Sequence, residues 1–572
     1  MLVRAAAPFP MTSAAYVLPA HRKLTHVARP ESPPIVTPET GPAKPPARSE
    51  WRARKGGPPP VTHTDVLWVT IAVLLSLASR IPFFNIPMIH DEGGYAYAAR
   101  GWIEGTGQLY DDLWISRPQG IFALYALVFE FLGTGTWALR FTAWVFAALT
   151  VIAVWMIGRR WTAPRIANLA AILSAIFLSW PNFEGFTANA EVFMGMPAAF
   201  AALWLLRMSQ RGWSAWQLAG VGVLAGLSTL LKPSGIVTLF IAWAFIWLLD
   251  GTRRQRLRRC GYVLAGISFV GIITLIHGYT LGWDDFIYAT VTYRLTHQSS
   301  ATVSLLHHLR AIGSLTYTSA ALVGILLLIG IFRARLPLLR TTAAPVVVHT
   351  PRRWTGFLTR FRLPHDEGGL LILLWVIGSI AGLAMGGDWW SHYMIQIVPP
   401  LSLWIAWNLD GIIRALRHWR RWLAVALMSV LVLLPYAIIV DGYDSMLERL
   451  YGHPGYPAQA DVAQYIRENT EPDDTIYVAF DQAAIYYLSD RKPAYRHLYD
   501  QELRALPDSY ADIIAIISGP NRPTYIVSTL HPGPFPDDSR AFWREVSLYY
   551  DLETMIDGVP IYRAREEPAP GS

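Results

Sequence analysis

Apolar runs alternate with short polar connections along the first 440 residues of the chain. A helix needs about 20 apolar residues to cross a bilayer, so each long run predicts a membrane span. We expect eleven spans, at residues 66–84, 137–157, 165–181, 192–207, 215–231, 234–249, 261–282, 311–332, 369–387, 394–409 and 422–440. A further run, Gln119–Gly133, is shorter and contains Glu130, so its length fits either a span or a helix on the membrane surface.

The distribution of Lys and Arg resolves this ambiguity, because the cytoplasmic loops of membrane proteins are enriched in positive residues. If residues 119–133 lie on the membrane surface, the loops that fall inside carry 21 Lys and Arg and the loops outside only five. If this run crosses the bilayer, every later loop changes sides and the rule fails. We therefore predict a cytoplasmic N-terminus and an extracytoplasmic C-terminus.

The pattern changes after residue 440, where the apolar runs shorten and charges become frequent. Helical periodicity alternates with short β-type runs, which is typical of a small α/β domain. The expected elements are helices at 460–469, 481–490 and 540–550, strands at 474–480 and 523–529, and a closing hairpin that turns at Asp557-Gly558.

The chain is thus predicted to have three parts. Residues 1–63 are rich in Pro, Ala and Thr, carry nine Lys and Arg against three acids, and are expected to be a disordered cytoplasmic tail. Residues 64–440 are expected to form the membrane region, with a first outer loop at 85–136. Residues 441–572 are expected to form the extracytoplasmic α/β domain.

The composition agrees with a polytopic α-helical membrane protein. Of the 572 residues, 53% are hydrophobic and only 16% are charged, against about 25% charged in soluble proteins. The net charge of +7 is cytoplasmic-loop charge, so it does not indicate a nucleic-acid partner. The single cysteine, Cys260, excludes internal disulfides and a Cys-based zinc site.

Because few ions fall on the outer face, each of them is a candidate for function. The pair Asp91-Glu92 follows the first span directly, and Arg117 comes later in the same loop. Lys232 lies at the mouth of the fifth span, and Arg294 lies in the loop 283–310. Simpler roles remain open: the acids can cap the next helix, Lys232 can extend to the membrane interface, and Arg294 can be solvated.

The first outer loop resembles that of the GT-C glycosyltransferases. The likeness is to the branch that holds the protein O-mannosyltransferases, the aminoarabinose transferase of lipid A and the rhizobial lipopolysaccharide transferases. The residues that carry it are Asp91-Glu92, Tyr95, Arg117-Pro118-Gln119, Gly133 and Arg140.

Two departures from that pattern matter. Arg117 and Gln119 replace the Lys and the second Pro of the family's turn. Ser116 stands where the aminoarabinose transferase has an acid, so a metal site that uses this acid is not carried over. We expect neither a metal nor a cofactor.

The resemblance implies a GT-C fold with interfacial helices in the first outer loop, and transfer of a sugar from a polyprenyl-phosphate carrier with inversion. Such a step needs a carboxylate base for the acceptor hydroxyl and cations for the leaving phosphate. Asp91 is the candidate base, and Glu92 is expected to orient the acceptor or hold Asp91. Arg117 is the first candidate for the phosphate, followed by Lys232 and Arg294.

Two further outer segments carry candidate residues. Glu191, just before the span at 192–207, matches an acid that relatives place in this short loop. The pair His392-Tyr393 precedes a span that contains proline, and by resemblance it is a candidate contact of the carrier phosphate. For each of these residues a structural role, as a helix cap or an interfacial anchor, is equally open.

The resulting hypothesis is a multi-pass glycosyltransferase of the plasma or inner membrane. Its expected partners are the lipid bilayer, a polyprenyl-phosphate sugar and a glycan, lipid or protein acceptor. The alternative is a transporter or flippase of a lipid-linked or polar substrate, but the spans show neither paired halves nor mid-span ionisable residues in number. A membrane polysaccharide polymerase or ligase is a third possibility, although such proteins lack the Asp-Glu opening.

Overall fold

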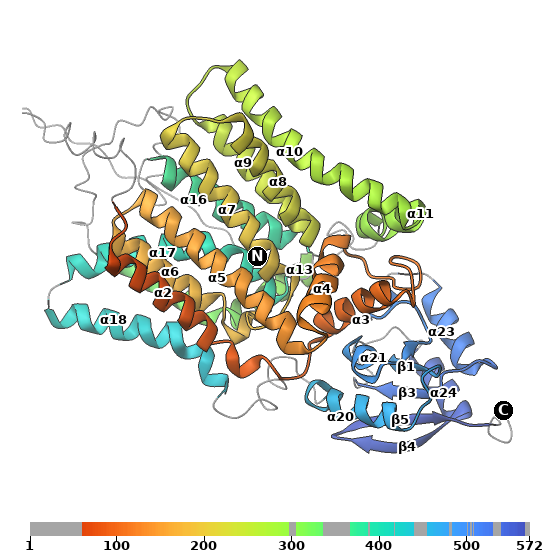
Figure 1. Ribbon diagram of the computed structural model, residues 1–572. Helices are drawn as coiled ribbons and strands as arrows, with labels where there is room; N and C mark the ends of the chain where they lie inside the picture. Colours follow the sequence, from red (N-terminus) through yellow and green to blue (C-terminus); the bar gives the residue numbers. More distant parts are fainter. Residues whose placement is uncertain are drawn as a thin grey trace, which may run out of the picture. The chain divides into compact units, whose positions relative to one another are not determined.

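A computed structural model (Figure 1) describes residues 60–296, 305–335, 366–386, 389–416, 418–439, 455–479, 483–499, 502–503, 506, 508–529 and 539–566. These residues all fall in one compact unit, residues 54–572. The predicted disordered tail lies almost entirely outside the described residues. The first helix begins at its end, where Thr62 and Asp65 form a capping box.

The regular elements described before residue 440 are all helices, joined by turns and loops. Its α-helices are α2 (His63–Ala78), α3 (His90–Glu104), α4 (Gln119–Leu132), α5 (Thr136–Trp161), α6 (Pro164–Phe177), α7 (Ala190–Arg211), α8 (Ala215–Leu231), α9 (Val237–Leu248), α10 (Arg253–Thr280), α11 (Trp283–Ile287), α12 (Tyr293–Thr296), α13 (Leu305–Thr318), α14 (Ala320–Arg335), α16 (Glu367–Ala384), α17 (Val398–Ala415) and α18 (His418–Leu433). Short irregular turns join several of them: η1 (Ile81–Phe83), η2 (Pro181–Phe183), η3 (Pro233–Ile236), η4 (Tyr288–Thr292), η7 (Ser391–Ile397) and η8 (Leu434–Ile439).

Among the described residues, six helices are long and apolar enough to cross a membrane, and a seventh is possible if the bent pair 312–332 counts as one span. The predicted count of eleven is therefore not confirmed. Three of the predicted spans, at 165–181, 215–231 and 234–249, are apolar helices of fewer than 18 residues. The run 119–133 forms the 14-residue helix α4, which is short for a span, as expected.

Glycines let the membrane helices pack closely. A Cβ at Gly222 on α8 would lie 2.0 Å from the carbonyl oxygen of Val263, and one at Gly266 on α10 would lie 1.9 Å from that of Ala219. Small residues of this kind let helix backbones approach each other, which is a common way to associate helices within a membrane.

The C-terminal region, residues 455–566, contains a five-stranded sheet in the order β2-β1-β3-β5-β4. Its elements are α20 (Gly455–Glu468), β1 (Thr475–Ala479), α21 (Ala483–Ser489), β2 (Lys492–Pro493), α23 (Ser509–Ser518), β3 (Tyr525–Ser528), α24 (Ser539–Tyr549), β4 (Tyr550–Ile556) and β5 (Val559–Ala564). Strands β2, β1 and β3 run parallel, whereas β5 is antiparallel to both β3 and β4. The predicted strands, helices and hairpin are confirmed, whereas β2 and α23 were not predicted.

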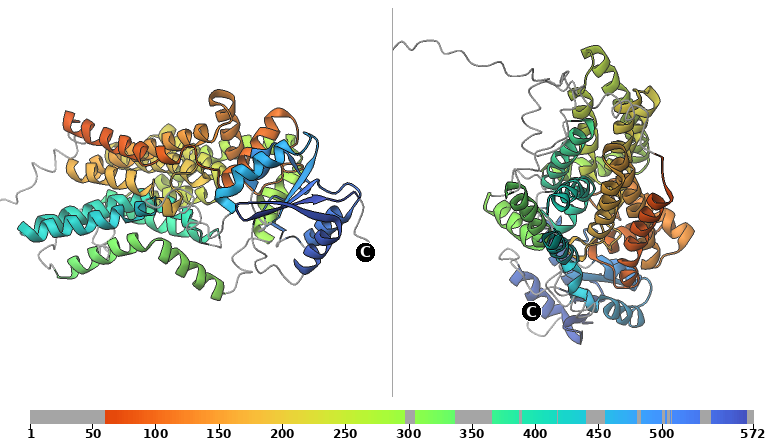
Figure 2. Two further views of the ribbon diagram at one scale, coloured as in Figure 1. Left: turned by 90° about the horizontal axis from the view of Figure 1, so that it is seen from below. Right: turned by 90° about the vertical axis from the view of Figure 1, so that its left-hand side faces the viewer.

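Alternate residues of the central strands face opposite sides of this sheet, as the two-residue period of a strand requires. Tyr477 and Ile526 belong to a small core with residues of α23 and α24. Ile476 and Val527 belong instead to the large core that includes α20, α21 and the membrane helices. Figure 2 shows these two layers, the light-blue α20 on one side of the sheet and the dark-blue helices on the other.

The C-terminal region packs directly against α3. A Cβ at Gly93 would lie 2.2 Å from the Cα atom of Ala484 on α21, so only glycine fits this crossing. Arg100 on α3 forms a 2.9 Å ion pair with Asp490, and the Tyr487 hydroxyl donates to the Thr134 carbonyl at 2.6 Å. The helix that carries Asp91 is thus covered by residues almost 400 positions later in the sequence.

Candidate active site

The candidate site begins at the first turn of α3, which contains both Asp91 and Glu92. The Glu92 carboxylate accepts the backbone N–H of Ile89 at 3.1 Å and so caps the helix. Acids are favourable at this end of a helix because the helix dipole is positive there. The capping role that the sequence left open therefore falls to Glu92.

Glu92 is fully buried and makes an ion pair with Arg140 of α5. Arg140 Nη2 lies 2.7 Å from Oε2 and Arg140 Nε lies 3.1 Å from Oε1. The backbone N–H of Ala188 donates to Oε1 at 2.6 Å, and Arg140 also donates to the carbonyls of Ile86 and Pro87, both at 3.0 Å. These bonds join α3, α5 and the segment before α7, and they engage both oxygens of the carboxylate.

Asp91, by contrast, has positive groups around it and no such pair. The residue is 9% exposed, and its Oδ1 atom lies 3.8 Å from Nε2 of His90. Burial alone would raise the pKa of Asp91, but the charges of His90, Arg117, His392 and Lys232 hold that pKa below its usual 3.8. The neighbouring cations therefore favour the ionised form of this carboxylate.

Two half-buried arginines near Asp91 share one acceptor. Arg117 donates from Nε to the Tyr95 hydroxyl at 3.0 Å and from Nη1 to the Ser116 carbonyl at 3.0 Å. Arg294 Nη2 donates to the same Ser116 carbonyl, and its Nε has no hydrogen-bond partner among the described residues. Burial and the Arg117 charge lower the pKa of Arg294 to about 10. Two cations with so few acceptors form a place where an anion would be stabilised.

The remaining candidates form a second group next to the first. Lys232, between α8 and η3, makes an ion pair with Glu191 of α7, and its ammonium lies 3.8 Å from the centre of the Tyr393 ring. His392 Nε2 lies 3.5 Å from Glu191 Oε1. Asn189 accepts the N–H of Ala190 and caps α7, so Glu191 is free to pair with these cations.

The structure thus brings together every residue that the sequence marked: Asp91, Glu92, Arg117, Glu191, Lys232, Arg294, His392 and Tyr393. It adds Glu184, whose Oε1 lies 3.3 Å from His392 Nδ1 and whose Oε2 has no hydrogen-bond partner among the described residues. Glu184 holds a left-handed φ of 53°, which is uncommon for a residue other than glycine. Its only signal in the sequence is an acid followed by Gly185 in a short loop.

Two tyrosines of the C-terminal region also reach this site and were not predicted. The Tyr456 hydroxyl bonds to Nδ1 of His90. The Tyr499 ring lies edge-on to His90, with ring centres 6.3 Å apart. Nothing in the local sequence around either tyrosine indicates a contact with α3, because the contact depends on how the two regions dock.

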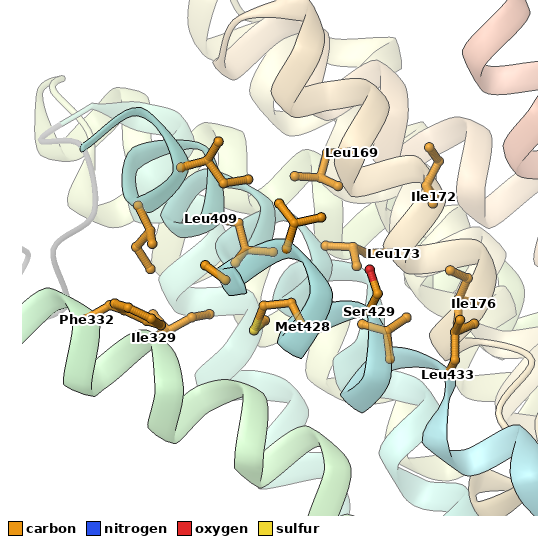
Figure 3. Close-up of a pocket in the computed structure, with 15 residues that line it drawn as sticks. Leu169, Ile172, Leu173, Ile176, Ile329, Phe332, Leu409, Met428, Ser429 and Leu433 are labelled. Atoms are coloured by element: carbon orange, nitrogen blue, oxygen red, sulfur yellow. The ribbon is translucent and has the colours of Figure 1, made fainter. Parts of the chain in front are cut away.

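The described residues contain no group of three or more His, Cys, Asp or Glu side chains placed to hold a metal ion. A cavity of about 240 Å³ lies elsewhere, among α6, α14, α17 and α18 (Figure 3). Its walls are Leu, Ile, Val, Phe, Met and Ala side chains with Ser429 as the one polar residue, and it shares no residue with the candidate site.

A family model described as dolichyl-phosphate-mannose-protein mannosyltransferase matches residues 116–277. The matched segment contains Arg117, Arg140, Glu191 and Lys232, whereas Asp91 precedes it and Arg294 follows it. No curated protein matches the chain.

Solved structures with the same fold cover most of the chain. ArnT from Cupriavidus metallidurans in the apo state is 16% identical, with a TM-score of 0.57 over 87% of this chain and 97% of ArnT. ArnT bound to undecaprenyl phosphate is 14% identical, with a TM-score of 0.55 over 90% of this chain and 98% of ArnT. The oligosaccharyltransferase of Archaeoglobus fulgidus tethered to an acceptor peptide is 13% identical, with a TM-score of 0.51 over 89% of this chain and 75% of that protein.

The family model covers Arg117, Gly133 and Arg140 of the motif, whereas Asp91, Glu92 and Tyr95 precede the matched segment, and the solved structures share the fold. The resemblance of this chain to the GT-C membrane glycosyltransferases is thereby confirmed.

Proposed function

We propose that the protein transfers a sugar from a polyprenyl-phosphate carrier to an acceptor hydroxyl on the extracytoplasmic face of the membrane. The observation that carries this proposal is that the buried carboxylate of Asp91 lies in the field of Arg117, which shares the Ser116 carbonyl with Arg294. A base and an anion site lie side by side, which are the two groups that such a transfer needs.

The proposed step is a single displacement. Asp91 takes the proton of the acceptor hydroxyl while the acceptor oxygen forms a bond to the anomeric carbon of the sugar. The bond from that carbon to the phosphate oxygen breaks, and its electron pair leaves with polyprenyl phosphate. The attacking oxygen and the leaving phosphate lie on opposite sides of the anomeric carbon, so the configuration inverts.

The cations stabilise the negative charge that grows on the leaving phosphate. Arg117 and Arg294 contact it first, because Arg294 Nε has an N–H without an acceptor among the described residues. Lys232, which pairs with Glu191 and lies against the Tyr393 ring, adds a further positive charge, and His392 lies 3.5 Å from the same Glu191 carboxylate. Glu92 acts as a positioning residue, because its oxygens are engaged by Arg140 and by backbone N–H groups.

A polyprenyl-phosphate donor is supported by the shared fold of ArnT, whose structure holds undecaprenyl phosphate. An acceptor outside the membrane is supported by the archaeal oligosaccharyltransferase, which is tethered to an acceptor peptide. The donor sugar remains open, as does the choice among a glycan, a lipid and a protein acceptor. The proposed chemistry uses no metal and no cofactor.

The proposed topology has eleven spans in the plasma or inner membrane, a cytoplasmic N-terminus and an extracytoplasmic α/β domain at residues 441–572. The convergence of the candidate residues supports it, since Asp91, Glu191, Lys232, Arg294 and His392 come from five segments predicted to lie outside. If residues 119–133 crossed the bilayer instead, the membrane would separate Asp91 from the other four residues.

The test uses the full-length protein in lipid nanodiscs with a panel of undecaprenyl-phosphate-linked sugars. Asp91→Asn and Arg117→Ala should each lower transfer at least about 100-fold, the usual contribution of a general base or of charge stabilisation. Asp284→Asn and Arg310→Ala are matched controls, because both side chains are exposed and both lie in the predicted outer loop 283–310.

Full transfer activity in both site variants would overturn the mechanism. Uptake of substrate into vesicles that contain no acceptor would instead support a transporter. Mass spectrometry of outer-face glycans in a deletion strain would then identify the sugar and the acceptor together.

A further inference from the structure

His90 lies between the C-terminal region and Asp91. Its Nδ1 bonds to the Tyr456 hydroxyl, and its ring meets two tyrosine rings edge-on, with centres 6.1 Å away for Tyr456 and 6.3 Å for Tyr499. On its other side, Nε2 lies 3.8 Å from Oδ1 of Asp91. One imidazole therefore connects a distant part of the chain to the candidate base.

The contact at Nδ1 fixes the rest of the ring. The two ring nitrogens point in different directions, so a bond at one of them sets the orientation of the other. Nε2 faces the Asp91 carboxylate, which can only accept, so Nε2 carries a proton. The Tyr456 hydroxyl holds the ring at Nδ1, accepting from it when the ring is charged and donating to it when the ring is neutral. Partners of this kind, one shell away from the reacting group, commonly set its geometry.

The tyrosine is itself held firmly in place. Tyr456 is 4% exposed and lies in α20. From the same helix the Gln459 amide donates to the carbonyl of Met88, two residues before His90. On α21, Ala484 packs against Gly93 at a distance that leaves no room for a side chain. Helices α20 and α21 together seat the C-terminal region on the first turn of α3.

We propose that Tyr456 is a positioning residue that the C-terminal region supplies to the active site, and that it acts by directing the Nε2–H of His90 at Asp91. The inference rests on the proposed function, because it needs Asp91 to be the base. It assigns the C-terminal region a part in the chemical step, in addition to any part in acceptor recognition. The hydrogen bond with Tyr456 and the edge contact from Tyr499 hold the ring in this orientation.

The experiment compares Tyr456→Phe with the wild type, using whichever undecaprenyl-phosphate-linked sugar the wild type transfers fastest. The variant keeps the ring and removes only the hydroxyl. We expect kcat to fall about tenfold, the value of one ordinary hydrogen bond, while KM for the donor stays within about twofold. A loss of substrate binding would raise KM instead, so this split separates positioning from binding.

A double-mutant cycle shows whether the effect passes through His90. His90→Ala should lower kcat at least as much as Tyr456→Phe, and adding Tyr456→Phe to His90→Ala should cost nothing further. His90→Gln, whose amide offers an N–H to Asp91, should retain more activity than His90→Ala.

Tyr487→Phe is the matched control. Its hydroxyl also joins the C-terminal region to the 85–136 loop, through the Thr134 carbonyl at 2.6 Å, but it does not touch His90. The control should leave kcat unchanged and should lower the melting temperature as much as Tyr456→Phe does.

Three outcomes would each overturn the inference. Tyr456→Phe could keep the wild-type kcat, Tyr487→Phe could lose as much kcat as Tyr456→Phe, or the losses of kcat in the double-mutant cycle could be additive. The proposed function fails differently, through full activity of Asp91→Asn. An inactive Asp91→Asn together with a fully active Tyr456→Phe would remove the positioning role alone.

Discussion

Two neighbouring regions of the candidate site differ in whether their charges are balanced. Around Glu92 the charges are balanced, because one carboxylate meets one guanidinium and backbone groups take up the remaining bonds. Around Arg117 and Arg294 they are not balanced, since two guanidiniums share one carbonyl. The first arrangement stabilises the fold, and the second is the proposed binding site for an anion. Adjacent acids in the sequence, Asp91 and Glu92, thus belong to different regions and serve different purposes.

The largest effect should follow from breaking the balanced region. Arg140→Ala leaves Glu92 charged and alone in a fully buried place, which costs about 3–5 kcal/mol in comparable proteins. We expect loss of folded protein, or a melting temperature lowered by many degrees in detergent. Arg140→Met with Glu92→Leu removes both charges and should recover much of that stability. A stable Arg140→Ala variant would contradict the comparison.

The unbalanced region should respond in the opposite manner. Arg294→Ala relieves the repulsion with Arg117, so stability should be unchanged or slightly higher. Binding of undecaprenyl phosphate should weaken about 10- to 100-fold, the value of a lost charge-assisted hydrogen bond. Isothermal titration with undecaprenyl phosphate measures the affinity, with Arg310→Ala as a control. Equal binding in Arg294→Ala and the wild type would rule out an anion site there.

The pH dependence of the transfer reaction tests how the neighbouring cations act on Asp91. The neighbouring cations lower the pKa of Asp91 below 3.8, so the carboxylate is lost only as the pH falls through that lowered value. Between pH 5 and pH 8, ionisation of Asp91 should therefore change kcat/KM by less than about 10%. In Arg117→Ala one of these cations is absent, so the acid limb of the residual activity should move to higher pH. An unchanged acid limb would mean that Arg117 does not act on Asp91.

The smallest effect should come from an exposed ion pair that belongs to neither region and joins α3 to the C-terminal region. Arg100 and Asp490 lie 2.9 Å apart, but the Asp490 side chain is 65% exposed. Exposed pairs contribute about 0–1 kcal/mol, so Asp490→Asn should shift the melting temperature very little and leave transfer unchanged. A large fall in the melting temperature or in transfer activity would show that this pair does more than join two surfaces.

The sequence indicates which residues are candidates for the site, but it does not indicate which contacts hold them in place. Asp91, Arg117 and Lys232 stood out as candidates because ionised residues are scarce near the predicted outer ends of apolar runs, and the structure places them close together. The opposed roles of Asp91 and Glu92 were not identifiable, because they depend on Arg140 lying 48 residues away. The contact of His90 with Tyr456, 366 residues apart, follows from docking alone.

The same limit applies to the fold. The hairpin at 550–564 was predictable because Asp557-Gly558 suits a turn with positive φ at both positions, as observed. Strand β2 has only two residues, which is too short for any periodicity. Helix α23 contains the apolar run IIAII, which a strand could also bury. Span counting failed to reach a firm number because several helices are short.

The seating of α21 on Gly93 also determines when the protein can become active. Synthesis proceeds from the N-terminus, so Asp91 and both arginines are present long before α20 and α21 exist. A nascent chain therefore has the proposed base and anion site before it has Tyr456, the proposed positioning residue of His90. If that proposal holds, full activity begins only once α20 and α21 have been made and have docked on α3.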